Sequence, residues 1–313
     1  MDEITEAVMG AGASQSGTEF EPATHVVDPV GEFVRWLSIR AKLRYDGDPH
    51  RVINYEDISY LAGQIRDDLL GEFDNPAITP LVEKAYSELW PLLPPTQGAV
   101  KEQLSSLAYA AVERIHNVLV DMLTKQPEQT CHLKLFCDAA HDCRVSELNL
   151  FTLNHDTLLE GFLTKHLDGT IQLTDGFESA ETVGIRQWAP HLFDKTSEQG
   201  KRRVSLFKLH GSIDWFRFLP SLQNHNKAWL GEFVGRARGS PPRGIVSRGG
   251  SEYTRMDGPL VLMGTFNKIL DYTRLAVFFE MHYRFVRALD ETGALILSKN
   301  EPACAKEHTG NEH

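Results

Sequence analysis

The sequence predicts an α/β protein with a mainly parallel sheet and a helical insertion after its first strand. Short apolar runs typical of buried strands occur at residues 148–153, 204–209, 259–265 and 294–297. Small or polar residues follow the first two runs and end the third, at the position where open α/β sheets bind ligands. Between residues 30 and 124, apolar residues instead recur at three- and four-residue spacing, which is typical of helices.

We interpret residues 4–9 as the first strand, because this short apolar segment runs directly into a glycine-rich turn. Glycines in such a turn let backbone N–H groups approach a phosphate closely. Ordinary tight turns contain the same G-x-G pattern, so the motif is weak evidence alone. The polar residues 14–29 suit either a loop that folds over a cofactor or a plain connector. The motif consists of Gly10, Ala11, Gly12, Ala13 and Ser14.

The helical insertion is predicted to cover about residues 30–145, with its apolar stripes in the core. One of its expected helices starts at Asn54, Tyr55, Glu56 and Asp57. Carboxylates are stabilised at a helix N-terminus by the helix dipole, so we favour a structural role for Glu56 and Asp57.

A cluster of cysteines and histidines near the end of this insertion suggests a metal site. It contains Cys131, His132, Cys137, His141 and Cys143. The spacing C-x5-C-x5-C lacks the C-x2-C pair of zinc sites, and helical positions six apart lie on different faces. We therefore expect no bound metal and no stoichiometric zinc in the purified protein.

The first candidate site lies at residues 148–160. Asn154 and Asp156 follow an apolar run and precede a helical pattern, and at two positions apart both could point at one ligand. The alternative is that Asp156 or Thr157 only caps the following helix.

The second candidate site follows the strand-like run 204–209, which ends in His210 and Gly211. A histidine at the end of a strand, followed by a residue without a side chain, can meet a ligand closely. The run 259–265 is read as another buried parallel strand, whose last residues are Gly264 and Thr265. If all the predicted strands belong to one sheet, neighbouring strand ends should carry Met9, Leu153, Leu209 and Met263.

The rest of the chain carries weaker signals. Short strands are expected at 170–173 and 215–219, and a helix at 270–289 in which His282 lies at the edge of the core. The segment 221–258 is rich in glycine, proline, serine and arginine. We favour a solvated loop over phosphate or partner contacts for its arginines, Arg236, Arg238, Arg243, Arg248 and Arg255.

The three motifs in this order resemble the sirtuin-like NAD-binding family. The matching residues are the glycine motif 10–14, the Asn-x-Asp motif within 152–156 and the His-Gly motif within 209–211. Residues 54–57 and 208–215 also look like the bacterial branch of the family, whose members cleave NAD, often in defence against phage. The resemblance implies a Rossmann-like fold in a single domain of residues 1–313. Its sheet would come from 1–29 and 146–298, followed by a polar tail, 299–313.

The resemblance also implies the roles of individual residues. Asn154 would hold the ribose or the attacking water, and Asp156 would anchor the nicotinamide carboxamide. His210 would act as general base, since an ordinary histidine pKa of about 6.5 suits work near neutral pH. The remaining residues expected to bind NAD are Gly10, Ala11, Gly12, Ala13, Ser14, Gly211, Gly264 and Thr265.

Two departures from the family pattern keep three functions open. The zinc ribbon of sirtuin deacylases, with its C-x2-C-type pairs, is missing, and a polar segment at 298–302 replaces the turn that touches adenosine in relatives. The leading function is an NAD glycohydrolase that yields nicotinamide and ADP-ribose. The alternatives are an NAD-dependent protein deacylase or ADP-ribosyl transferase, and a non-catalytic sensor of NAD or ADP-ribose.

Composition bounds the partners and the compartment. The formal net charge of -11 argues against general nucleic-acid binding, which needs a basic surface. No apolar run approaches the roughly 18 residues of a membrane helix, and the acidic start has no signal-peptide layout. Four cysteines without regular spacing favour a reducing compartment, so we expect a cytoplasmic protein. An enzyme that destroys NAD must be restrained, so we also expect a homo-oligomer or a regulatory protein partner.

Overall fold

The computed structural model has an α/β fold that divides into two compact units. Unit 1 comprises Met1–Met122 and Leu262–Asp271, and unit 2 comprises Leu123–Val261 and Tyr272–His313. The structure describes residues 3–10, 28–44, 52–71, 76–89, 100–125, 130–178, 185–195, 201–221, 232–237, 245–248, 251–256, 258–263 and 275–291. None of the helices within these ranges is long and apolar enough to span a membrane.

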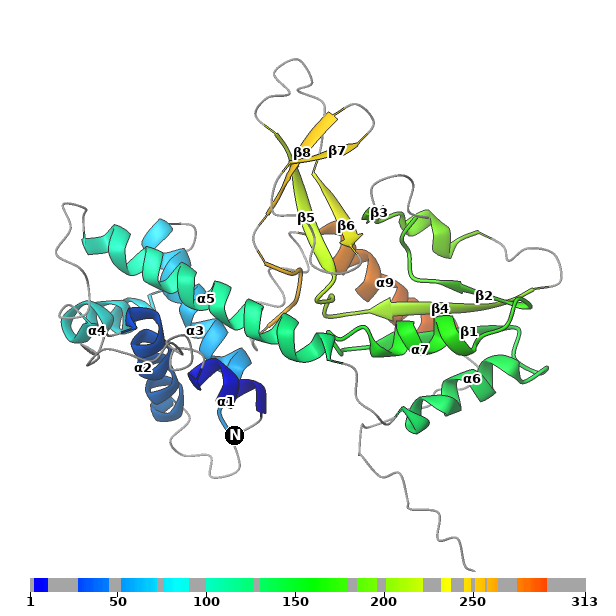
Figure 1. Cartoon of the computed structure of the whole chain (residues 1–313), viewed down its shortest axis with the longest axis horizontal. Coiled ribbons are helices and arrows are strands. Elements are labelled where there is room, and N and C mark those ends of the chain that lie inside the picture. Colours follow the sequence, from blue (N-terminus) through cyan, green and yellow to red (C-terminus); the bar gives the residue numbers. More distant parts are fainter. Residues whose placement is uncertain are drawn as a thin grey trace, which may run out of the picture. The chain divides into compact units, whose positions relative to one another are not determined.

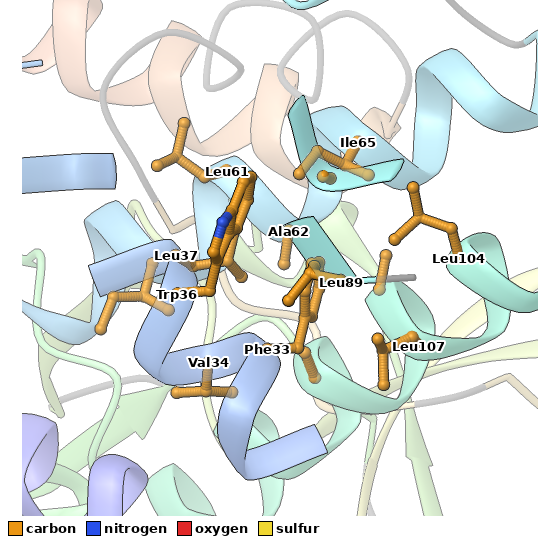
Figure 2. Close-up of a cluster of buried hydrophobic side chains, with 14 of the residues drawn as sticks. Phe33, Val34, Trp36, Leu37, Leu61, Ala62, Ile65, Leu89, Leu104 and Leu107 are labelled. Atoms are coloured by element: carbon orange, nitrogen blue, oxygen red, sulfur yellow. The ribbon is translucent and has the colours of Figure 1, made fainter. Parts of the chain in front are cut away.

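Unit 1 is built from helices, as the sequence periodicity predicts. These helices are α1 (Glu3–Gly10), α2 (Pro29–Arg44), α3 (Tyr55–Leu70), α4 (Thr79–Leu89) and most of α5 (Val100–Thr124). Their apolar stripes meet in one core, in which Phe33, Leu37 and Ile65 are fully buried (Figure 2). Burial of these stripes stabilises the helices, because the packing of an apolar face supplies most of the stability of helices in proteins.

Residues 54–57 have the structural role that we favoured. Asn54 is the N-cap of α3, and its side chain accepts a hydrogen bond from the backbone N–H of Asp57 at 3.1 Å. The Asp57 carboxylate accepts one in return from the backbone N–H of Asn54 at 3.2 Å. This reciprocal capping box satisfies two backbone donors at the helix start.

The expected first strand is wrong. Residues 4–9 lie inside α1, where Thr5 and Val8 are buried. Acidic residues in the first turn, Glu3 and Glu6, and an apolar pair four apart, Ile4 and Val8, favour a helix over a strand. Met9 therefore does not end a strand.

Unit 2 contains a parallel sheet of three strands, but a second, antiparallel sheet has five, so the described strands are not mainly parallel as we predicted. The strands of the parallel sheet are β1 (Glu147–Thr152), β2 (Ile171–Thr174) and β4 (Arg202–Lys208), in the spatial order β1-β4-β2. The chain passes from β1 to β2 through α7 (Leu158–His166), and β4 later inserts between the two strands.

Helices cover both faces of this sheet (Figure 1). Leu150 and Leu206 point to one face and pack with residues of α7 and α6 (Lys134–His141). Their neighbours Phe151 and Phe207 point to the opposite face, as successive strand residues do. There the two rings stack at 4.6 Å between centroids, and Phe285 of α9 (Ala276–Glu291) meets Phe151 at 5.1 Å.

A second, antiparallel sheet in unit 2 corrects two expectations. It has the order β3-β6-β5-β8-β7 and is formed by β3 (Ile185–Gln187), β5 (Trp215–Pro220), β6 (Phe233–Ala237), β7 (Ile245–Arg248) and β8 (Ser251–Arg255). The segment 221–258 is thus not simply a loop, because it supplies three of these strands. The described part of 259–265 contains no parallel strand, only an antiparallel bridge between Val261 and Gly211.

The helix predicted at 270–289 is present as α9, but its buried face differs from the expected one. Val277, Phe278 and Met281 are buried, whereas Phe279 is 62% exposed. His282 is also exposed rather than at the edge of the core. The short helices η2 (Cys131–Leu133) and η3 (Pro190–Phe193) complete the described elements of unit 2. The strand expected at 294–297 and the polar tail lie outside the described residues.

Candidate functional site

The first two candidate motifs lie side by side at one edge of the parallel sheet. Strands β1 and β4 pair in parallel, with Thr152 opposite Lys208 as their last residues. The backbone N–H of Leu209 then donates to the carbonyl of Thr152 at 2.9 Å. The turns that follow the two strands therefore begin at the same level. In open α/β sheets this edge is where ligands bind.

Two histidine rings meet between these turns. The ring centroids of His155 and His210 are 6.1 Å apart and tilted by 30°. His155 is buried, whereas His210 is only partly buried and Asn154 is exposed. The sequence assigned no role to His155, and the structure places its buried ring beside that of His210.

Asp156 makes the helix-capping contact that the sequence offered as one alternative. Its Oδ1 accepts a hydrogen bond from the backbone N–H of Leu158 at 2.9 Å, at the start of α7. This contact uses one carboxylate oxygen of a partly exposed side chain, and an ionised carboxylate has further acceptor capacity. Capping and ligand binding by Asp156 are therefore compatible.

Gly211 has a packing role in the structure. Its φ of 78° lies in the left-handed region, and a Cβ atom there would lie 2.0 Å from the carbonyl oxygen of Leu260. The next residue, Ser212, donates its backbone N–H to the same oxygen at 3.0 Å. The space where a side chain of residue 211 would lie is therefore occupied by another segment of the chain, and not left for a ligand as we expected.

The predicted phosphate-binding turn is only partly described. Gly10 is the last residue of α1, in unit 1, and not part of a strand-to-loop turn. A helix C-terminus presents carbonyl groups, which do not attract an anion, so α1 itself provides no phosphate cradle at Gly10. Ala11, Gly12, Ala13 and Ser14 lie outside the described residues, as do Gly264 and Thr265. Their binding to NAD stays a prediction.

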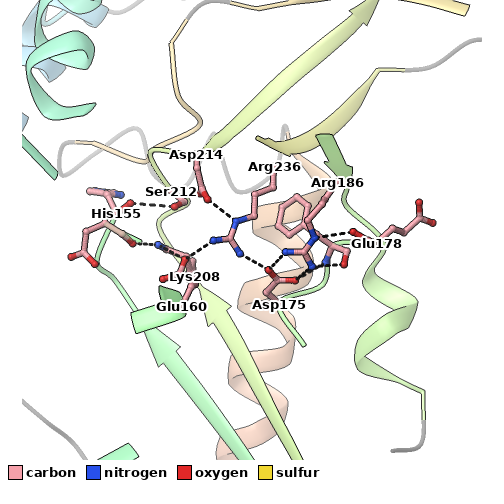
Figure 3. Close-up of polar contacts among 11 residues, drawn as sticks. His155, Glu160, Asp175, Glu178, Arg186, Lys208, Ser212, Asp214 and Arg236 are labelled. Carbon is pink, nitrogen blue, oxygen red and sulfur yellow. Dashed lines mark hydrogen bonds and ion pairs between the residues drawn. The ribbon is translucent and has the colours of Figure 1, made fainter. Parts of the chain in front are cut away.

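A network of charged side chains, which the sequence did not reveal, begins at the end of β4 and extends to the antiparallel sheet (Figure 3). Lys208 of β4 pairs with Glu160 of α7 at 2.8 Å, and both side chains are almost fully buried. Arg236 of β6 pairs with Asp214 at 2.6 Å and also with Asp175. Arg186 of β3 completes the network by binding Asp175 at 2.7 Å.

These six side chains carry three negative and three positive charges, so their formal charges cancel. Burial alone would raise the pKa of Asp175. The charges of Arg236 and Arg186 outweigh this effect and lower the pKa of Asp175 below its ordinary value. Burial likewise disfavours the charged form of Arg236, but Asp214, Asp175 and Glu160 raise the pKa of its guanidinium. Asp175 and Arg236 therefore keep their charges at neutral pH.

The position of Arg236 corrects the expectation of a solvated loop. Its side chain is only 14% exposed, because β6 holds it against Asp214 and Asp175. The alternation of Phe233, Gly235 and Ala237 with larger or polar residues signals this strand, but the surrounding glycines and prolines concealed it.

Two of the described cysteines lie in different surroundings. Cys137 is buried in α6, where burial raises the pKa of its thiol, and Cys143 is exposed. Across the part of the chain that the structure describes, no three His, Cys, Asp or Glu side chains are grouped so as to hold a metal ion.

Comparison of the chain with protein-family models and with curated proteins finds no match.

Proposed function

We propose that this protein is an NAD glycohydrolase, which cleaves NAD to nicotinamide and ADP-ribose. One observation carries the proposal. The turns that contain Asn154 and His210 lie next to each other at the carboxyl ends of the strands of a parallel sheet that helices cover on both faces, which is where open α/β sheets bind ligands. The family resemblance of the two motifs supplies the identity of the substrate.

The reaction replaces the bond between nicotinamide and the ribose C1′ atom by a bond to water. Nicotinamide leaves with the bonding electron pair, and positive charge develops on the ribose ring in the transition state. An oriented amide and a carboxylate can position the sugar, the water and the leaving group. In this proposal Asn154 holds the ribose or the water, and Asp156 holds the carboxamide. His210 accepts the proton that the water loses.

The accessibility of the side chains supports these roles. Asn154 is exposed and His210 partly buried, so a ligand can reach both. His155 and the ion pairs below are buried, so they support the site and do not form its surface. No metal enters this chemistry. The proposal includes a cytoplasmic role in bacterial defence against phage or stress, with activity restrained by self-association or by a regulatory partner.

The test is to incubate the purified chain with NAD, with and without an acylated peptide, and to quantify nicotinamide and ADP-ribose by chromatography. Release of both products without peptide is the expected result. Consumption of NAD only with peptide would favour a deacylase or transferase. Binding of NAD or ADP-ribose without turnover would favour a sensor.

A further inference from the structure

The most buried charge of the candidate site is the ammonium group of Lys208. This residue is only 2% exposed, at the end of the central strand β4. Removing an ammonium from water is costly unless its donors find acceptors. The acceptors that bind the buried ammonium group therefore indicate the structural role of Lys208.

Lys208 joins a helix to a turn. Its Nζ donates to Oε1 of Glu160 at 2.8 Å and also to the backbone carbonyl of Asp156. Glu160 is itself 5% exposed and belongs to the first turn of α7. The carboxylate thus fixes the ammonium, and the ammonium holds the carbonyl of a residue in the Asn-x-Asp turn (Figure 3).

A second set of contacts holds the preceding residue of the same turn. The carbonyl of His155 accepts a hydrogen bond from the backbone N–H of Ile213 at 3.0 Å and from Oγ of Ser212 at 3.2 Å. Strand β1 ends at Thr152, so the ladder to β4 does not extend through this turn. Contacts to Lys208, Ser212 and Ile213 therefore help to fix the conformation of this turn.

The same network of charged side chains also contacts the His-Gly loop, which follows β4. Glu160 lies 3.8 Å from Arg236, which pairs with Asp214 of that loop. Oε2 of Glu160 and Oδ1 of Asp214 are buried and have no hydrogen-bond partner among the residues that the structure describes. A buried network left partly unsatisfied is a poor source of stability, and apolar residues would serve that purpose as well. The network also fixes two turns against each other, and apolar residues would not reproduce this geometric effect.

We propose that Lys208 is a positioning residue for NAD cleavage. Held by Glu160, it fixes the Asp156 carbonyl and so presents the side chains of Asn154 and Asp156 beside His210. This inference rests on the proposed function and adds a residue that does not touch the substrate. Loss of the ammonium should misplace the reacting groups, and a displacement of about 1 Å can cost roughly 100-fold in rate.

The test compares two double variants with the wild-type chain. Lys208→Met alone would leave the Glu160 charge buried and unpaired, so it is combined with Glu160→Gln to remove both charges. The control is Arg284→Met with Asp194→Asn, which removes another ion pair of unit 2, 2.8 Å long, between α9 and the residue after η3. NAD turnover is measured over a range of NAD concentrations beside a melting curve for each protein.

For the Lys208 and Glu160 double variant we expect kcat per folded molecule to fall about 10- to 100-fold. Its KM should stay within about threefold, because most of the NAD molecule lies away from the reacting bond. The control should keep its kcat per folded molecule whatever its melting temperature. A wild-type kcat in the first double variant, or a loss that the unfolded fraction accounts for, would overturn the positioning role alone. A wild-type chain that never cleaves NAD would overturn the proposed function and this role together.

Discussion

At the scale of single residues, the candidate site is made of groups that have structural contacts as well as proposed chemical ones. The Asp156 side chain caps α7, its carbonyl accepts from Lys208, and the neighbouring His155 carbonyl binds the loop after β4. A substitution in these turns therefore changes stability as well as activity. Rates must accordingly be referred to the folded fraction of each variant.

Gly211 is a position where a small change should cost much stability. Gly211→Ala would force an L-residue to φ 78° and place its Cβ 2.0 Å from the Leu260 carbonyl oxygen. We expect the free energy of unfolding to fall by about 2–4 kcal/mol, measured by urea denaturation. Gly169→Ala is the control, because nothing lies within 4 Å of the Cβ it would add. Equal stability of the two variants would contradict the described packing.

At the scale of elements, the sequence predicts those parts whose apolar pattern has a single interpretation. The helices of unit 1 and the strands β1 and β4 follow from strong periodicity or from dense apolar runs. Residues 4–9 are too short and mixed to separate a strand from a helix, and here the acidic first turn favours a helix. Strand β6 lies among glycines and prolines, so its alternating pattern was hidden.

The candidate site is predictable from the sequence to a similar degree. Two strand-like runs that are followed closely by Asn154 and His210 imply that these side chains share one end of the sheet, because ligand sites form where parallel strands end. The Lys208 and Glu160 pair is 48 positions apart, and the contact depends on the side of β4 that α7 covers. That information is tertiary, so no local pattern reveals it.

The capping box of α3 gives a test at this scale. Asn54→Ala removes the side-chain acceptor of the Asp57 N–H, so we expect a loss of about 1 kcal/mol in the free energy of unfolding. Asn54→Ser keeps a capping oxygen and should recover most of this loss. Urea denaturation of the two variants beside the wild-type chain decides the matter. An alanine variant as stable as the serine variant would show that the cap contributes nothing.

At the scale of the whole molecule, one histidine of unit 1 should make the stability of the chain depend on pH. His116 of α5 is partly buried, and its Nδ1 has no hydrogen-bond partner among the described residues. Burial, together with the charge of Arg66, lowers the pKa of His116 from 6.5 to about 4. The folded chain therefore keeps this histidine neutral where the unfolded chain protonates it.

The sign of the pH effect follows from this difference in proton uptake. Between pH 6.5 and about 4 the unfolded state binds the extra proton, so the free energy of unfolding contributed by His116 falls as the pH falls. The loss is at most about 3 kcal/mol and is absent above pH 6.5. His116→Leu should be less sensitive to acid than the wild-type chain over this range, as measured by urea denaturation at several pH values. Parallel pH curves for the two proteins would refute this assignment.

The central claim is that the paired turns after β1 and β4 cleave NAD, and one measurement tests it most directly. Asn154→Ala and His210→Ala are assayed for release of nicotinamide from NAD, each beside a melting curve, with His282→Ala on the exposed face of α9 as control. The account predicts at least about 100-fold slower release for both site variants, because a lost general base alone typically costs this much. It predicts wild-type release for the control and a folded state for all three proteins. Release at the wild-type rate by either site variant would contradict the claim.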